Sequence, residues 1–202
     1  MSESGAERHC SADHAALVAQ VERVAQVWAV LEQVLDPEVP ALSICDLGIV
    51  RDVCWKGGTV AKEGTWESGG GGLEVVLTPT YSGCPATEVI EQSVRAAINQ
   101  AGLGPVSVRL QRAPAWTTDW MSAAGRQKLK DYGIAPPGHL LSEKERPVRF
   151  LPRRVANSAP KLACPRCDST QTEMLSAFGS TACKSLYRCL ACQEPFEHFK
   201  PI

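Results

Sequence analysis

The 202-residue sequence contains no run of the ~18–20 consecutive apolar residues that a membrane-spanning helix requires. Its first residues, MSESGAERHCSADH, are polar and include acids, so the basic and apolar regions of a secretory signal or organelle-targeting peptide are also missing. These absences predict a cytoplasmic protein with no membrane partner. We expect residues 1–13 to form a disordered tail, while an apolar content of 44% is enough for a packed core in the rest.

The sequence also lacks the common signatures of a self-contained enzyme. None of its four histidines pairs with a carboxylate in a recognisable pattern, and there is no phosphate-binding glycine loop and no nucleophile elbow. We therefore expect that the isolated chain is not an enzyme. A thiol-dependent enzyme that uses Cys84 stays open as an alternative.

Charge is distributed unevenly along the chain. Residues 1–100 hold 14 acidic and 6 basic side chains, whereas residues 101–202 hold 8 acidic and 15 basic ones. An acidic half followed by a basic half favours docking onto other proteins, or a basic face for nucleic acid. Nucleic-acid binding is the weaker alternative, because no strip of aromatic residues alternates with the basic ones.

Hydrophobic periodicity predicts an α+β domain over residues 14–132, with helices covering one face of a small three-stranded sheet. The predicted elements are helix 17–35, strand 49–55, strand 73–77, helix 85–101, strand 106–110 and helix 119–132. A long glycine-rich connection joins the first two strands. Residues 133–160, which contain five prolines and the basic run RPVRFLPRR, are expected to form a linker.

Four cysteines near the end of the chain have the spacing of a metal site. Cys164 and Cys167 form one C-x-x-C motif, and Cys189 and Cys192 form a second one after 21 residues. Two such turns can close a tetrahedron of sulfurs about 2.3 Å from a metal ion. This spacing predicts a zinc ribbon over residues 161–202 that holds one structural zinc. An iron–sulfur cluster or two redox pairs are the alternatives, and Cys183 is expected to be a buried non-ligand.

A single cysteine, Cys84, lies between a predicted strand and a predicted helix in TPTYSGCPATEVI. Because Pro85 opens the helix, the sulfur should lie near free backbone N–H groups, which lower the pKa of a thiol. The alternative is a small buried side chain. The earlier loop DPEVPALSICDLG, with Asp36, Glu38 and Asp46, is expected either to form turns or to lie beside Cys84.

These motifs together resemble a known family. DPEVPALSICDLGIV, TPTYSGCPATEVI and APAWTTDWMS resemble the small domain of SufT and of cytosolic iron–sulfur assembly factors. The tail from CPRC through FGSTACKSLYRCLAC resembles the zinc ribbon of the PaaD family, whose members are accessory components of the bacterial phenylacetyl-CoA 1,2-epoxidase.

The resemblance implies an accessory protein of aerobic phenylacetate degradation that matures an iron–sulfur cluster or di-iron centre of this multicomponent monooxygenase. Cys84 matches the reactive cysteine of such domains, so it is the candidate transient ligand of iron or of an iron–sulfur cluster. The implied partners are the oxygenase or reductase components of the epoxidase system, and a homodimer stays open.

Overall fold

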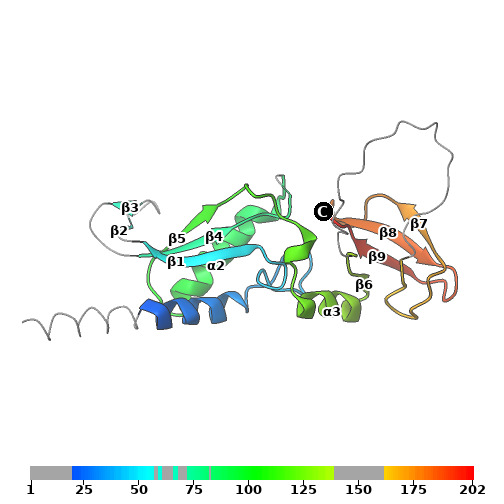
Figure 1. Ribbon diagram of the computed structural model, residues 1–202, viewed down its shortest axis with the longest axis horizontal. Coiled ribbons are helices and arrows are strands. Elements are labelled where there is room, and N and C mark those ends of the chain that lie inside the picture. Colours follow the sequence, from blue (N-terminus) through cyan, green and yellow to red (C-terminus); the bar gives the residue numbers. More distant parts are fainter. Residues whose placement is uncertain (1–19, 57–58, 61–65, 68–71, 82, 139–161) are drawn as a thin grey trace, which may run out of the picture. The chain divides into compact units, whose positions relative to one another are not determined.

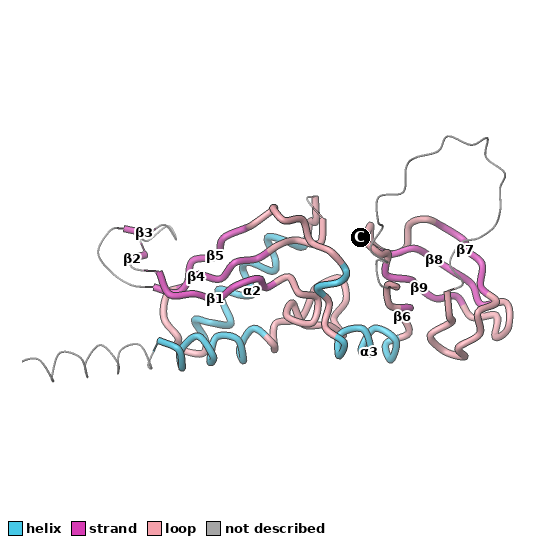
Figure 2. The backbone as a smooth tube through the Cα atoms, viewed as in Figure 1, coloured by secondary structure: helices cyan, strands magenta, loops and turns pink. Residues whose placement is uncertain are grey.

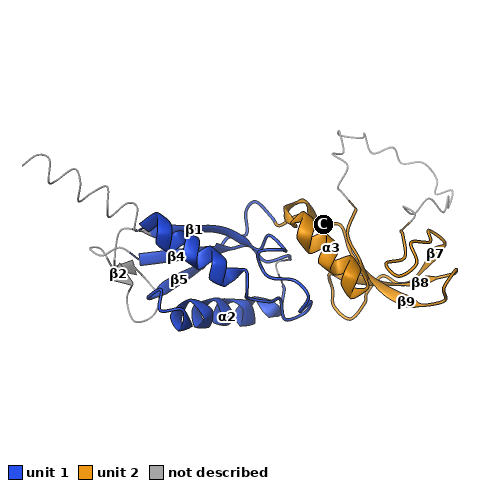
Figure 3. Ribbon diagram, turned by 90° about the horizontal axis from the view of Figure 1, so that it is seen from below, with its two compact units in different colours: residues 1–115 blue, residues 116–202 orange. Residues whose placement is uncertain are grey.

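The computed structural model describes residues 20–56, 59–60, 66–67, 72–81, 83–138 and 162–202. The chain divides into two compact units, Met1–Ala115 and Trp116–Ile202, and each is described by itself (Figure 3). The predicted tail and most of the predicted linker lie outside the described residues. Within the described parts, no helix has the length and apolar character needed to cross a membrane.

The first unit is built on a three-stranded sheet in the order β1-β4-β5 (Figure 1). Its strands are β1 (Val50–Lys56), β4 (Gly72–Leu77) and β5 (Val106–Leu110), which match the three predicted strands. β1 is antiparallel to β4, whereas β5 is parallel to it. Two further strands, β2 (Thr59–Val60) and β3 (Trp66–Glu67), pair with each other within the glycine-rich connection.

The pairing register separates an apolar face of this sheet from a polar one. Val53 pairs with Val75, which in turn pairs with Val108, so apolar side chains share one face across all three strands. The opposite face carries Glu74, which forms an ion pair with Arg109 at 3.2 Å. Two helices supply the remaining apolar surface of the core. The buried residues of the helix over residues 20–31 and of α2 (Ala86–Gln100) include Val27, Leu31, Ile90, Val94 and Ile98.

The second unit contains a four-stranded sheet in the order β6-β9-β8-β7 (Figure 2). Its strands are β6 (Ile134–Ala135), β7 (Thr172–Ser176), β8 (Lys184–Cys189) and β9 (Pro195–Phe199). Strands β7, β8 and β9 form an antiparallel ribbon, and β6 joins its edge in parallel with β9. The unit also contains the short 3-10 helix η1 (Thr118–Trp120) and the helix α3 (Ala123–Tyr132).

Helix α3 has a defined capping residue at each end. The Ser122 hydroxyl accepts a hydrogen bond from the backbone N–H of Gly125 at 2.8 Å and caps the N-terminus. Gly133 ends the helix with a φ of 93°, a left-handed conformation that glycine adopts without steric cost. The sharp turn at Gly133 leads directly into β6.

The division between the two units differs from the predicted domain boundary at residue 132. Residues 116–135 pack with the ribbon because their side chains and backbone complete it. The ring of Trp116 lies 6.1 Å from that of Phe199, and the backbone N–H of Thr118 donates to the carbonyl of Ile202 at 3.0 Å. Residues 134–135, predicted as the start of the linker, form β6 instead.

Candidate metal centre and the Cys84 loop

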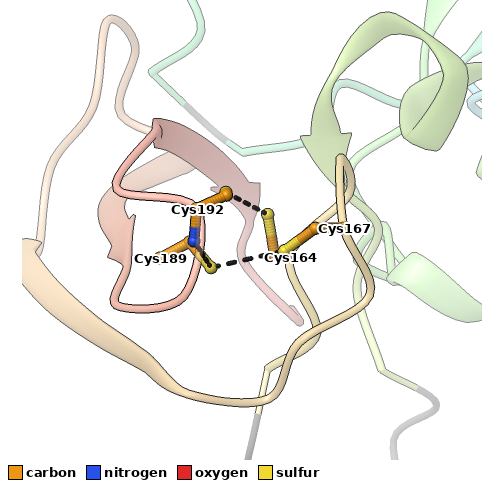
Figure 4. Close-up of side chains that lie close together, drawn as sticks. All are labelled: Cys164, Cys167, Cys189 and Cys192. Atoms are coloured by element: carbon orange, nitrogen blue, oxygen red, sulfur yellow. Dashed lines mark hydrogen bonds between the residues drawn. The ribbon is translucent and has the colours of Figure 1, made fainter.

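The second unit brings the sulfurs of Cys164, Cys167, Cys189 and Cys192 together, as their spacing predicts (Figure 4). Cys164 and Cys167 lie in the turn that precedes β7. Cys189 ends β8, and Cys192 lies in the turn between β8 and β9. Two turns that are distant in the sequence therefore face each other across one point.

Both turns use the same backbone device. The backbone N–H of Cys164 donates to the carbonyl of Ser169 at 2.9 Å, and that of Cys189 donates to the carbonyl of Glu194 at 3.0 Å. The residue directly after the second cysteine adopts a positive φ in each turn, 56° at Asp168 and 65° at Gln193. This left-handed residue reverses the chain, so that both sulfurs of a motif point to a common centre.

The sulfur positions fit a tetrahedral metal ion. The Sγ atoms of Cys164 and Cys192 are 3.8 Å apart, those of Cys167 and Cys189 are 3.5 Å apart, and all four lie within 4.8 Å of one another. Four sulfurs at about 2.3 Å from a central zinc would be separated by about 3.8 Å. The four cysteines could therefore hold zinc with little movement. Such a set fills every position of the ion, which suits a structural metal.

The protonation of Cys167 and Cys189 also favours a cation at the cluster. The backbone N–H of Cys192, 3.5 Å from the sulfur, lowers the pKa of Cys189 to about 6. At Cys167 the backbone N–H of Ser169 acts in the same direction, but the Cys189 sulfur, desolvation and the other two sulfurs outweigh it and raise the pKa to about 12. Cys167 and Cys189 therefore resist losing both of their protons together unless a positive ion neutralises them.

An apolar shell surrounds the cluster. Ala135 and Phe196 are buried against Cys164 and Cys189, and the ring of Tyr187 stacks on that of Phe196. Cys183 lies outside the group of four sulfurs and is buried, with its sulfur 3.0 Å from the hydroxyl of Thr181. Its position agrees with the predicted buried non-ligand.

In the first unit, Cys84 lies in the turn between β4 and α2 and is half-buried. Pro85 occupies the N-cap position, so α2 starts at Ala86, one residue later than predicted. The backbone N–H of Ala86 and the side chain of Tyr81 both form hydrogen bonds with the Cys84 sulfur. The backbone N–H of Thr87 also donates to the Cys84 carbonyl at 3.2 Å, so the turn holds the cysteine in place.

The expectation that the pKa of Cys84 is lowered at the start of the helix is wrong, because the sum of all effects raises this pKa. Burial raises the pKa of the Cys84 thiol, and the nearby carboxylates of Glu38 and Asp36 raise it further. The hydrogen bonds from Ala86 and Tyr81 act in the opposite direction without offsetting these effects. Cys84 is therefore a protonated thiol at neutral pH, and its turn lies close to an acidic loop.

The acidic loop combines its two predicted roles. The Asp36 carboxylate accepts hydrogen bonds from the backbone N–H groups of Glu38 and Val39 at 2.9 and 2.8 Å, which is turn chemistry. Asp46 does the same for the backbone N–H of Ser43 at 3.1 Å. The same loop brings Glu38 and Asp36 near enough to act on Cys84.

The remaining candidates stay outside these sites. Cys45 and Cys54 are half-buried, and burial followed by Glu32 and Asp46 raises the pKa of Cys45 to about 12. Cys10 and His139 lie outside the described residues. His198 is in β9, and its buried position lowers its pKa to about 4. Tyr81 was not among the predicted site residues. Its position three residues before Cys84 is the sequence feature that could have indicated it.

The raised pKa of Cys84 leads to a first prediction. At pH 7.5, Cys84 should react with iodoacetamide more slowly than an unhindered cysteine, because less of it is thiolate. Glu38→Gln removes a carboxylate that raises the pKa and should speed the reaction by up to about tenfold, the change in thiolate fraction per pKa unit. Tyr81→Phe removes a stabilising donor and should slow it.

The rate is measured by mass spectrometry of the peptide that contains Cys84. Cys54 of the same protein sample serves as the internal reference. Equal rates in the two variants would contradict the electrostatic account.

A family model and a curated protein that match this chain agree with each other. The family model of the PaaD zinc beta ribbon domain matches residues 152–200. A protein of Escherichia coli (strain K12), provisionally named as a subunit of 1,2-phenylacetyl-CoA epoxidase, is 47% identical over 181 residues, which cover 89% of this chain and 94% of the relative.

Two further relatives match a smaller part of the chain. An Fe-S protein maturation auxiliary factor of Porphyromonas gingivalis (strain ATCC BAA-308 / W83) is 30% identical over 100 residues, which cover 49% of this chain and 83% of the relative. A crystal structure of a domain of unknown function, DUF59, from Bacillus anthracis shares 25% identity over 56% of this chain and 96% of that chain, with a TM-score of 0.44. With a curated relative matched along nearly its whole length and a zinc ribbon matched by its own family model, the chain belongs to the PaaD family.

Proposed function

We propose that this protein is an accessory component of the phenylacetyl-CoA 1,2-epoxidase system, where it matures the iron–sulfur cluster or di-iron centre of that monooxygenase. Cys84 is the transient ligand of the iron or cluster that is passed on. Cys164, Cys167, Cys189 and Cys192 hold the structural zinc of the ribbon.

The observation that carries this proposal is the pair of relatives. The relative matched along most of this chain is named as an epoxidase component, and a second one is named as an Fe-S maturation factor. Similarity to both relatives supports a protein that assembles a metal centre for an enzyme of phenylacetate degradation.

The surroundings of Cys84 support its role as a metal-delivery ligand. A protonated thiol exchanges its proton for a metal cation on binding, and the Glu38 and Asp36 carboxylates that disfavour the thiolate also attract that cation. The Tyr81 and Ala86 donors can then stabilise the metal-bound sulfur. A single protein thiol provides an incomplete ligand set, which favours transfer over permanent storage.

The two alternatives receive less support. The described ribbon over residues 162–202 carries four basic and four acidic side chains, so it offers no excess of positive charge to nucleic acid. A thiol-dependent enzyme reacts through the thiolate, yet the pKa of Cys84 is raised and residues 20–115 contain no histidine that could deprotonate it.

The test replaces Cys84 by Ser in a strain that otherwise lacks the protein. We expect epoxidase activity and the iron content of its components to fall at least ~10-fold, while the variant accumulates normally and keeps its zinc. Cys54→Ser, which changes another half-buried cysteine of the same unit, is the matched control. Normal iron loading of the epoxidase components in the Cys84→Ser strain would refute the proposal.

A further inference from the structure

One group of apolar side chains in the ribbon faces solvent. Met174, Leu175 and Phe178 lie at the end of β7 and in the loop after it, and their exposed fractions are 58%, 49% and 67%. Phe178 is the most exposed of the large apolar residues that the structure describes. Single exposed apolar residues are common on proteins, but here three of them fall within residues 174–178, in an edge strand and the loop after it.

The position of these residues in the sheet leaves them accessible. β7 lies at the edge of the four-stranded sheet and pairs with β8 alone among the described strands. An edge strand with exposed apolar side chains invites pairing with another chain. The irregular pairing between Met174 and Ser176 interrupts the ladder there, which favours contacts made by side chains over the addition of a further strand.

Interactions on the inner side of the loop that carries Phe178 fix the loop backbone. Lys184 and Glu197 form an ion pair at 2.9 Å, and the Lys184 side chain is only 4% exposed. The Glu197 carboxylate also accepts a hydrogen bond from the backbone N–H of Ser180 at 2.6 Å. A Cβ at Gly179 would lie 2.6 Å from the same carboxylate, so the loop backbone lies directly against it.

The outer side of the loop is fixed as well. The Lys200 ammonium lies 4.5 Å from the centre of the Phe178 ring and donates to the Ala177 carbonyl at 3.2 Å. The backbone N–H of Phe178 donates to the Ser176 hydroxyl at 3.2 Å. These contacts hold an exposed aromatic ring in one place, so little conformational entropy would be lost when a partner covers it.

The charge at this surface indicates what kind of partner fits. Glu173 pairs with Arg188, and Lys184 pairs with Glu197, so these charges are balanced within the ribbon. Lys200 contacts a carbonyl and an aromatic ring, and no carboxylate pairs with it among the described residues. The surface is therefore apolar with one unbalanced positive charge at its rim.

We propose that Met174, Leu175, Phe178 and Lys200 form a docking surface for a protein component of the epoxidase system, one that offers an apolar pocket rimmed by carboxylates. Phe178 enters the pocket and Lys200 meets the carboxylates. This inference rests on the proposed function, since it names how the ribbon reaches the component that receives the metal.

The test titrates the purified, zinc-loaded full chain separately against the purified oxygenase and reductase components of the organism that encodes it, by calorimetry. We expect one of them to bind, and Phe178→Ser to weaken that binding at least ~10-fold. Lys200→Glu should also weaken it and remove part of its salt dependence. Tyr132→Ser, which changes a ring that is 57% exposed in the same unit, is the matched control and should bind normally.

Cys84→Ser separates this inference from the proposed function. It should bind the component as tightly as the unaltered protein, even though it stops maturation. If maturation survives in Cys84→Ser while Phe178→Ser still weakens binding, the maturation role fails and the docking surface stands. Unchanged binding by a folded Phe178→Ser variant would overturn the docking surface. So would binding of neither component, or self-association of the chain that Phe178→Ser abolishes.

Discussion

Removing the zinc, or replacing Cys189 by Ser, is expected to unfold the ribbon of β7, β8 and β9 while the β1-β4-β5 sheet stays folded. Cys189 is fully buried at the centre of the cluster, and the apolar shell around it contains few large side chains. In small zinc modules the bound ion contributes about 10–16 kcal/mol of folding free energy. Loss of even a few kcal/mol would speed amide exchange in the ribbon by about 100-fold or more.

Hydrogen exchange followed by mass spectrometry checks this expectation, with peptides from residues 184–199 compared with peptides from residues 72–110. Cys45→Ser is the control, because it makes the same chemical change at a cysteine outside the cluster. If peptides 184–199 kept full protection in protein whose zinc had been removed, the metal would not be what holds the ribbon together.

Replacing Lys184 by Met is expected to destabilise the second unit by about 3–5 kcal/mol, because it leaves the partly buried Glu197 carboxylate without its cation. Burial alone would raise the pKa of Glu197, but the Ser180 backbone N–H and the Lys184 ammonium outweigh it, so the pKa is lowered. Because the pKa of Glu197 is lower in the folded protein than in the unfolded chain, its carboxylate stabilises the fold at pH values above the ordinary pKa of glutamate. This stability is lost as the pH falls through the lowered pKa. Lys184→Met should reduce that pH dependence.

Urea unfolding monitored by tryptophan fluorescence measures the effect, since Trp116 is buried in this unit. Arg188→Met is the control, because Arg188 and Glu173 form an exposed ion pair worth about 0–1 kcal/mol. The double variant Lys184→Met with Glu197→Gln should lose less than the sum of the two single changes. Equal effects of Lys184→Met and Arg188→Met would show that burial adds nothing to the Lys184–Glu197 pair.

The helices and the three strands predicted over residues 17–132 could be recognised because their signals are local. Alternation of apolar residues indicated the strands, and Pro85 indicated the start of α2 to within one residue. The grouping of the last helix was not predictable in this way. It depends on contacts such as Trp116 with Phe199, which join residues more than eighty positions apart. Nothing near Trp116 in the sequence indicates that its partner lies in the ribbon.

The four-cysteine cluster could be predicted from the sequence and the pKa of Cys84 could not, again because only local signals can be read from the sequence. Each C-x-x-C motif specifies its own turn, so the four-sulfur cluster followed from spacing alone. The pKa of Cys84 depends on Glu38 and Asp36, which reach it from a loop more than forty residues earlier. Local reasoning included the helix start that favours the thiolate and omitted the distant carboxylates and the burial that disfavour it.

The pairing of β6 with β9 also bears on how such a chain could have arisen. Residues 134–135 fall at the start of the predicted linker and residues 195–199 lie after it, yet both belong to one sheet. A gene fusion that attached residues 161–202 to the end of a finished domain would supply β9 without its neighbour, and Phe199 without Trp116. The ribbon and the segment that begins at Trp116 therefore belong to one structural unit, and a recombination point before Trp116 would transfer it intact.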